Sequence, residues 1–229
     1  MVKAVISGDI VASTSLSDAG RTYVEETLQD LFERLKTDFD VFGRIIKGDY
    51  IECVVPQPEN SLRIALVIKS LIKSISINDD YTNKSDKRVK LFKTYGIRLA
   101  IGYGELSRYN SEKGIIDGEA IYLSGRKLSE LSTYNKERVT IKNSLYFVSS
   151  NEKLNTKFDP LLALLDVLIN KATSRQSEVL YYKLMKFTEE DIVSKMKISQ
   201  PVVNQHSTSV GWSAIESAIN YYSNTLKNL

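Results

Sequence analysis

The sequence predicts an α+β protein, in which a ferredoxin-like or palm-type antiparallel sheet carries helices on one face and a small all-α unit follows. Three observations support this class. In the first 150 residues, runs rich in Val and Ile alternate with segments of helical period, in the order β-α-β-β-α-β. From residue 158 onward only helical patterns occur. No long-period repeat interrupts this order.

Composition fits a globular protein with a proper core. Hydrophobic residues make up 42% of the 229 residues and charged residues 26%. The net charge of +3 is too mild to indicate nucleic-acid binding by itself. The single cysteine, Cys53, excludes an internal disulfide. No signal peptide and no apolar run near the roughly 20 residues needed to span a bilayer is visible, so we expect a cytoplasmic protein without a membrane partner.

The chain begins with a pattern typical of a buried central strand. Met1–Val11 is rich in Val and Ile and contains Gly-Asp near its end. Arg21–Leu35 has apolar residues at helical spacing. Val41–Ile46 and Tyr50–Val55 then flank Lys47-Gly48-Asp49, where glycine suits a tight hairpin turn. The sequence therefore predicts a strand, a helix and a β-hairpin.

The second half of this unit continues the alternation. Asn60–Ile75 has a helical period, and the polar stretch 78–90 predicts an exposed loop. Gly96–Gly104 predicts another central strand, which a turn at residues 114–119 connects to a helix over Ala120–Leu131. Val139–Val148 predicts a final strand or two.

We expect a domain boundary between residues 150 and 158, which divides the chain into domains 1–150 and 158–229. A turn of three or four residues between two short helices of the second domain is the pattern of a helix-turn-helix. Four helices are expected there: Leu161–Ile169, one from Thr173 or Ser174 to about Met185, one from Thr188 to about Met196, and one that contains residues 202–219 and follows a short turn at residues 198–201.

Two aspartates carry the functional hypothesis. Asp9 ends a strand and Asp49 lies in the hairpin turn. Carboxylates meeting at such positions could share a divalent cation, Mg²⁺ or Mn²⁺, which in turn could hold a triphosphate. The plain alternative is that both are turn residues whose side chains bind nearby backbone. Glu52 is expected on the opposite face because it follows Asp49 by three positions. Arg98 is either an edge charge or a dimer contact.

Four short motifs resemble, in order, the catalytic domain of class III nucleotidyl cyclases. They are residues 8–14 (GDIVAST), 47–49 (KGD), 97–102 (IRLAIG) and 118–126 (GEAIYLSGR). The whole chain, including its C-terminal helices, resembles SatD-type bacterial proteins. The cyclase-like part covers about residues 1 to 150.

The resemblance implies roles for particular residues. Asp9 and Asp49 match the metal-binding pair, and the nucleoside triphosphate would be the ligand. Arg126 matches the arginine that stabilises the transition state from across a head-to-tail homodimer; its plain alternative is a surface charge paired with Glu130. The backbone N–H groups expected to cradle phosphates belong to Ile10, Val11, Ala12, Ser13 and Thr14.

The departures from the cyclase pattern concern base and ribose selection. Tyr122 stands where the family has an asparagine that orients the ribose, and Ile45 replaces the base-selecting lysine. Ile115 stands in place of the base-selecting acid, although Asp117 lies close by. Tyr122 and Asp117 are therefore the candidates for positioning the substrate. The resemblance therefore implies that metal ligation is retained and that purine selection is lost or changed.

The C-terminal unit gives a competing hypothesis, a non-enzymatic DNA-binding regulator that uses its first domain to dimerise or to sense a nucleotide. Gln200, Asn204 and Gln205 could read base edges in a major groove. Against this, residues 199–211 contain no Lys or Arg to contact phosphates. The same helices could instead dock a protein partner, and a scaffold with neither activity is a third possibility.

Overall fold

The structure is a computed structural model that describes residues 2–46, 48–83, 86–130 and 141–229. Lys47 and residues 131–140, which include the end of one predicted helix and the start of the last predicted strand, lie outside the described residues. The strands are β1 (Val2–Ile10), β2 (Phe42–Ile45), β3 (Tyr50–Val55), β4 (Ile97–Asn110), β5 (Ile115–Gly118) and β6 (Leu145–Ser149). The helices are α1 (Asp18–Phe39), α2 (Ser61–Ser74), α3 (Val89–Tyr95), α4 (Glu119–Glu130), α5 (Glu152–Lys171), α6 (Ser174–Leu184), α7 (Glu189–Met196), α8 (Gln200–Ser209) and α9 (Trp212–Lys227).

A six-stranded sheet organises the chain, with the order β2-β3-β1-β4-β5 and with β6 paired to β4. The predicted antiparallel sheet is confirmed for the strands of the main path. β6 is a correction, because it runs parallel to β4 along Leu99–Tyr103. The 14 residues of β4 pair with β1, β5 and β6, which makes β4 together with β1 the centre of the sheet.

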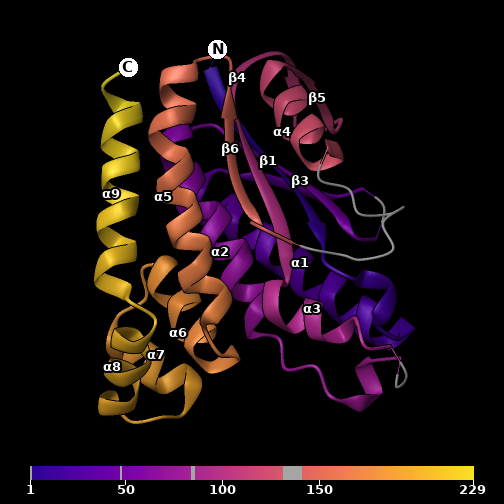
Figure 1. Cartoon of the computed structure of the whole chain (residues 1–229), viewed down its shortest axis with the longest axis vertical. Helices are drawn as coiled ribbons and strands as arrows, with labels where there is room; N and C mark the ends of the chain where they lie inside the picture. Colours follow the sequence, from indigo (N-terminus) through magenta and orange to yellow (C-terminus); the bar gives the residue numbers. More distant parts are fainter. Residues whose placement is uncertain (1, 47, 84–85, 131–140) are drawn as a thin grey trace.

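Helices cover both faces of the sheet, whereas the sequence predicted one face. Residues of α1, α2, α5, α6 and α9 share one buried cluster with Ala4 and Ile6 of β1. α4 packs on the other face, where Ala120 joins Val5 and Val54 in a second cluster. Figure 1 shows α4 on one side of β1 and β4 and α5 and α9 on the other. Helical periodicity reveals an apolar stripe but not the face that it covers.

Glycine lets α4 lie close to the sheet. A Cβ atom on Gly102 of β4 would come within 2.1 Å of the Ala120 carbonyl oxygen. The hydroxyls of Ser7 on β1 and Ser124 on α4 are buried and hydrogen-bonded at 2.8 Å. This contact fixes α4 above the strand that leads to Asp9.

Replacing Gly102 with alanine is expected to lower the free energy of unfolding by about 1–3 kcal/mol, because the added methyl group must push α4 off the sheet. Gly125 of α4 is the matched control, since a Cβ there would meet only the Tyr50 hydroxyl at 3.6 Å. Gly125→Ala is expected to stabilise by about 0.5–1 kcal/mol through helix propensity. Urea titration followed by circular dichroism checks the opposite signs; equal effects would contradict this account of the contact.

Three elements differ from their sequence predictions. α3 lies in Val89–Tyr95, where lysines hide the helical pattern next to the predicted loop. β5 is a short strand at Ile115–Gly118, where a turn was expected. The last predicted helix is two helices, because Gly211 has a left-handed φ of 76° and separates α8 from α9.

The C-terminal helices share the core of the sheet domain. Phe158 and Tyr222 are buried and pack against Phe147 of β6, with ring centroids 4.9 and 5.9 Å from that of Phe147. The Tyr222 hydroxyl hydrogen-bonds Ser61 of α2 at 2.8 Å. Residue 158 therefore lies inside α5 rather than at its start, and the division into 1–150 and 158–229 stays a prediction.

A smaller cluster of buried residues, distinct from the main core, joins α6, α7 and α8. Val179, Ile192, Met196 and Val203 form it. Residues 197–199 connect α7 and α8, so α8 begins at Gln200, inside the turn that the sequence predicts at residues 198–201. The helix-turn-helix assignment itself stays a prediction.

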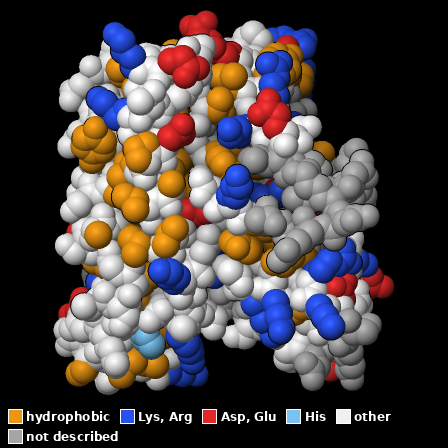
Figure 2. All heavy atoms as spheres, in the orientation of Figure 1, with side chains coloured by type: hydrophobic (Ala, Val, Ile, Leu, Met, Phe, Trp, Pro, Cys, Tyr) orange, Lys and Arg blue, Asp and Glu red, His pale blue; other side chains and the backbone are white. Residues whose placement is uncertain are grey.

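The outer surface of α5 carries exposed apolar side chains, those of Leu164, Val167 and Leu168. Figure 2 shows hydrophobic side chains gathered over α5 and α9. In the described part of the chain no helix is both long and apolar enough to cross a membrane.

Candidate functional site

The structure brings the two predicted metal ligands together at one end of β1. Asp9 is the Cα partner of Tyr50, the residue that follows Asp49. The N–H of Ile10 donates to the Asp49 carbonyl at 2.8 Å, which locks the hairpin turn against the strand. The pKa of Asp9 is raised, first by burial, and the negative charge of Asp49 contributes to the rise. The backbone contacts therefore hold Asp9 and Asp49 next to each other at the end of β1.

Arg98 is the cation that faces Asp9 across the sheet. The two are Cα partners in the β1–β4 register, and Arg98 Nε donates to Asp9 Oδ1 at 3.0 Å while the terminal nitrogen Nη2 contacts Oδ2. Arg98 is 9% exposed. Its bidentate pairing opposes the burial effect on the pKa of Asp9. Arg98 is not an edge charge, because β4 is a central strand; a dimer contact stays untested.

Glu52 lies on the same sheet face as Asp9, contrary to expectation. In the β1–β3 register, Ser7 faces Glu52 and Asp9 faces Tyr50, so all four side chains belong to one face. The expectation was wrong because Asp49 lies in the turn, so the strand alternation starts at Tyr50. Glu52 accepts a hydrogen bond from Arg44 Nε at 2.9 Å, which leaves it paired with a cation of its own.

The predicted phosphate loop divides into two parts. The N–H groups of Ile10 and Val11 are not available, because they donate to the carbonyls of Asp49 and Gly96. Ala12 has a left-handed backbone, φ 54° and ψ 36°, and Ser13 starts a 3₁₀ turn. Within the described residues the N–H groups of Ala12, Ser13 and Thr14 have no acceptor. Successive N–H groups around a left-handed residue form a concavity that suits an anion.

Ser13 connects this loop to the carboxylate pair. Its hydroxyl donates to Asp49 Oδ2 at 2.8 Å. The hydrogen bond orients the Asp49 side chain toward the loop and leaves the other oxygen, Oδ1, for a further partner. The side-chain-to-backbone role that the sequence left open for Asp49 does not occur among the described hydrogen bonds.

Tyr122 and Asp117 meet at the junction of β5 and α4. The Tyr122 hydroxyl donates to Asp117 Oδ1, and Arg108 of β4 pairs with Asp117 Oδ2 at 2.9 Å. These contacts lower the pKa of Asp117, with the Tyr122 hydrogen bond as the larger cause. The two predicted substrate-positioning residues thus form one exposed network with Arg108.

Arg126 lies exposed on α4, one turn beyond Tyr122. It forms no ion pair within the described part of the chain, so the predicted pair with Glu130 is not formed there. α4 covers the sheet face that carries Asp9 and Tyr50, and Gly125 lies next to the Tyr50 hydroxyl. Arg126 therefore extends from the helix that borders the site without contacting Asp9 or Asp49 in the described structure.

The predicted DNA-reading residues are exposed on α8, as base reading would require. Gln200, Asn204 and Gln205 all belong to its first turns. Gln200 Nε2, however, donates to Glu189 Oε2 at 3.2 Å. A carboxylate at the entry of this helix repels a phosphate backbone. The exposed face of α8 is therefore poorly suited to DNA binding.

Donor chemistry at the site fits Mg²⁺ or Mn²⁺, since hard cations take oxygen ligands. Asp9 and Asp49 supply two carboxylates. No group of three or more His, Cys, Asp and Glu residues that could hold a metal ion occurs among the described residues. A cation here would complete its shell with water or phosphate oxygens.

Sequence reasoning missed Arg98 as the partner of Asp9 and Glu52 as a neighbour on the same face. The strand alternation from Tyr50 could have placed Glu52 correctly. Arg98 had no such signal, because 89 residues separate it from Asp9 and only the β1–β4 register joins them.

Two solved structures are similar to this chain. One is a bacterial light-regulated adenylyl cyclase, with a TM-score of 0.42 and 15% identity over 69% of this chain and 78% of that one. The other is the guanylyl cyclase Cya2, with a TM-score of 0.38 and 13% identity over 64% of this chain and 74% of that one. No protein-family profile matches the chain. No curated protein matches it either.

Proposed function

We propose that this chain binds a nucleoside triphosphate through a divalent cation held by Asp9 and Asp49, as a divergent, cyclase-like domain that acts as a homodimer. One observation carries the proposal. Asp9 and Asp49 are neighbours in the backbone, beside the loop whose N–H groups at Ala12, Ser13 and Thr14 have no acceptor among the described residues. Carboxylates next to an anion-binding loop suit a metal-bound triphosphate.

Each group of the site would have its own role in nucleotide binding. The N–H groups of the loop bind phosphate oxygens, and Ser13 keeps Asp49 turned toward that loop. Arg98 holds Asp9 in a fixed orientation through its two guanidinium contacts. When bound, Mg²⁺ or Mn²⁺ would neutralise phosphate charge and lower the pKa of an attacking hydroxyl. Arg126, exposed on α4, would add positive charge to a triphosphate held by the partner subunit.

Base and ribose recognition would differ from the cyclase pattern. Asp117 is already engaged by Tyr122 and Arg108, so its carboxylate is not open for a base amino group. Arg108 is exposed and keeps donors that Asp117 does not use. A cationic group here would favour acceptor atoms on the nucleotide over donors. Purine selection by a free carboxylate is therefore not part of the proposal.

Substituting either aspartate is expected to abolish metal-dependent nucleotide binding. Purified Asp9→Asn and Asp49→Asn variants should lose at least about tenfold in affinity for nucleoside triphosphate with Mn²⁺, since each removes one of two charged ligands. Calorimetric titration with each of the four triphosphates measures affinity, and mass spectrometry of the incubated mixture detects any product.

Asp40→Asn is the matched control, because Asp40 is exposed at the end of α1, in a left-handed conformation that asparagine tolerates. It should bind nucleotide like the unmodified protein. If Asp9→Asn and Asp49→Asn both keep their Mn²⁺-dependent nucleotide binding, the proposal is wrong, whatever products form.

A further inference from the structure

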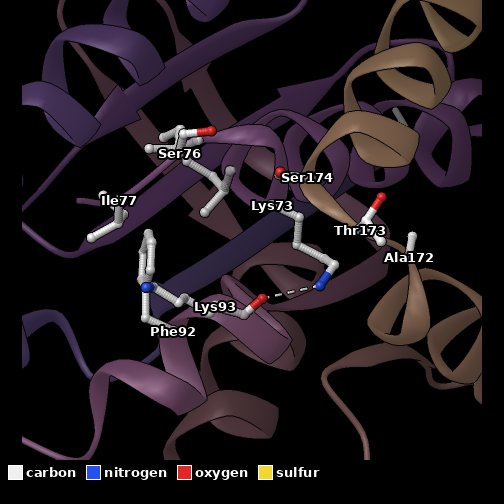
Figure 3. A pocket seen from close by; sticks show the side chains of 10 residues that line it. Lys73, Ser76, Ile77, Phe92, Lys93, Ala172, Thr173 and Ser174 are labelled. Atoms are coloured by element: carbon white, nitrogen blue, oxygen red, sulfur yellow. Dashed lines mark hydrogen bonds between the residues drawn. The ribbon is translucent and has the colours of Figure 1, made fainter.

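A cavity of about 300 Å³ lies where the C-terminal end of α2 meets α3 and the junction between α5 and α6. Figure 3 shows Lys73 crossing it, between Phe92 and Lys93 of α3 and Thr173 at the start of α6. A second cavity of about 510 Å³ shares Ile75, Ser76 and Ser174 with it, so the two cavities lie next to each other. Volumes of this size suit a small organic molecule.

Lys73 is a buried cation without a counter-ion in the described part of the chain. It is 6% exposed, and its Nζ donates only to the neutral carbonyls of Thr94, Lys93 and Asn170, at 2.5, 3.3 and 3.4 Å. The nearby carboxylate, Asp166, pairs instead with Lys69 at 3.4 Å. A buried charge with no partner of opposite sign is costly, so an anion in the cavity would relieve it.

The charges around Lys73 also favour an anion in the cavity. Burial, and after it the charge of Lys69, lower the pKa of Lys73 to about 8, although Asp166 acts in the opposite direction. The cavity lining adds Lys93 from α3 and contains no acidic residue. From α6, Arg175 and Glu178 line the neighbouring cavity and pair with each other at 2.8 Å, so their charges offset. The positive charge at the first cavity therefore comes from Lys73 and Lys93.

The first turn of α6 adds donors to the same wall. Thr173 and Gln176 form a capping box, in which Gln176 N–H donates to Thr173 Oγ1 at 3.2 Å and Thr173 N–H donates to Gln176 Oε1 at 2.9 Å. The N–H groups of Ser174 and Arg175 have no acceptor within the described residues. Free N–H groups at a helix start favour an anion.

We propose that this cavity binds a small amphipathic anion, in which a carboxylate or phosphate group faces Lys73 and an apolar body contacts Ile72, Ile77 and Phe92. The buried ammonium supplies the charge, the start of α6 supplies N–H donors, and the apolar lining selects against a bare inorganic ion. The site uses neither Asp9 nor Asp49, so it goes beyond the proposed function.

Three probes distinguish the sources of such an anion. Benzoate and phenyl phosphate carry an apolar ring, inorganic phosphate carries none, and benzyl alcohol is the neutral control. Titration up to about 10 mM, followed by calorimetry and by amide shifts of Ser76 and Ser174, should show saturable binding of at least one ring-bearing anion at pH 7 and none of the alcohol. Tightest binding of inorganic phosphate would overturn the amphipathic class.

Two variants with different effects on folding keep the test decisive. Lys73→Met removes the charge and should weaken benzoate binding at least about tenfold, while Lys153→Met, at an exposed lysine of α5, should not. In Ser76→Trp the indole would fill the cavity from an exposed position, so this variant should also lose benzoate binding, whereas Ser76→Ala should not. Full binding by both Lys73→Met and Ser76→Trp would overturn the proposal.

Benzoate affinity should also fall between pH 7 and 9.5, because the anion needs protonated Lys73 and benzoate itself keeps its charge over that range. Asp9→Asn should bind benzoate like the unmodified protein, so the two proposals fail independently. No saturable binding of any ring-bearing anion at pH 7 would end this one.

Discussion

Replacing Asp166 with asparagine is expected to lower the free energy of unfolding by about 3–5 kcal/mol, the usual cost of breaking a buried ion pair on one side. The change keeps the shape of the side chain and removes only its charge. Lys69 is fully buried and has Asp166 as its only carboxylate partner among the described residues. Without it, Lys69 and Lys73 would both be buried cations one helical turn apart.

The hydrogen bonds of Asp166 add to this cost. Its Oδ2 accepts the Ser144 N–H at 2.6 Å and its Oδ1 accepts the Ser144 hydroxyl at 2.8 Å. Lys69 Nζ also donates to that hydroxyl, at 2.7 Å, and to the Ile97 carbonyl at 3.2 Å. The network thus ties α2 and α5 to the start of β4, the strand that carries Arg98 to the candidate site.

The stability of the Asp166→Asn variant should also depend on pH. Burial lowers the pKa of Lys69 in the folded protein, and loss of Asp166 removes an interaction that raises it. Between the lowered pKa of Lys69 in the folded protein and about pH 10.4, its pKa in the unfolded chain, Lys69 is protonated in the unfolded chain and neutral in the folded protein. Stability therefore rises with pH in that window. The penalty of Asp166→Asn should therefore shrink as the pH approaches 10.

Urea unfolding at pH 7 and pH 9.5 measures both effects, and Lys69→Met/Asp166→Asn tests the pair as a unit. The double variant should lose less stability than the sum of the single losses. Glu178→Gln is the control, because its partner Arg175 is mostly exposed and the pair should contribute less than about 1 kcal/mol. A loss below 1 kcal/mol for Asp166→Asn would show that the ion pair does not hold this part of the core.

Local patterns predicted the elements whose signals are local. The helical period of α1 and α2 and the glycine turn between β2 and β3 all led to elements that the structure contains. β5 was missed because four residues next to a glycine turn look like the turn itself. The position of α4 was missed because it depends on Gly102 and Ser7, which no helical pattern within α4 reveals.

The candidate site shows the same division. Asp9 and Asp49 were predicted from their turn contexts, and the structure places them side by side; their role in metal binding stays a prediction. Arg98 was ambiguous because a charged residue within a strand gives no sign of the strand it will face. The register that pairs it with Asp9 is set by the packing of the whole sheet, and no local signal encodes it.

Replacing Arg98 with methionine is expected to lower the free energy of unfolding by about 2–3 kcal/mol, since it leaves Asp9 partly buried without its cation. Mn²⁺ should then stabilise the variant more than the unmodified protein. The guanidinium makes one contact to each carboxylate oxygen of Asp9, which leaves room for a metal, but its positive charge opposes a cation at that site. Its removal therefore strengthens cation binding by Asp9, while Asp49 supplies the second carboxylate.

Thermal and urea unfolding with and without Mn²⁺ measure the recovery, which would reach about 2.7 kcal/mol once free Mn²⁺ exceeds its Kd a hundredfold. Arg98→Met/Asp49→Asn should lose this recovery, because only one carboxylate remains. Arg108→Met controls for loss of a positive charge; its side chain is 74% exposed, so stability should change by less than about 1 kcal/mol and should not respond to Mn²⁺. If Mn²⁺ leaves Arg98→Met unchanged, Asp9 and Asp49 form no cation site, and the contact between Arg98 and Asp9 has only a structural role.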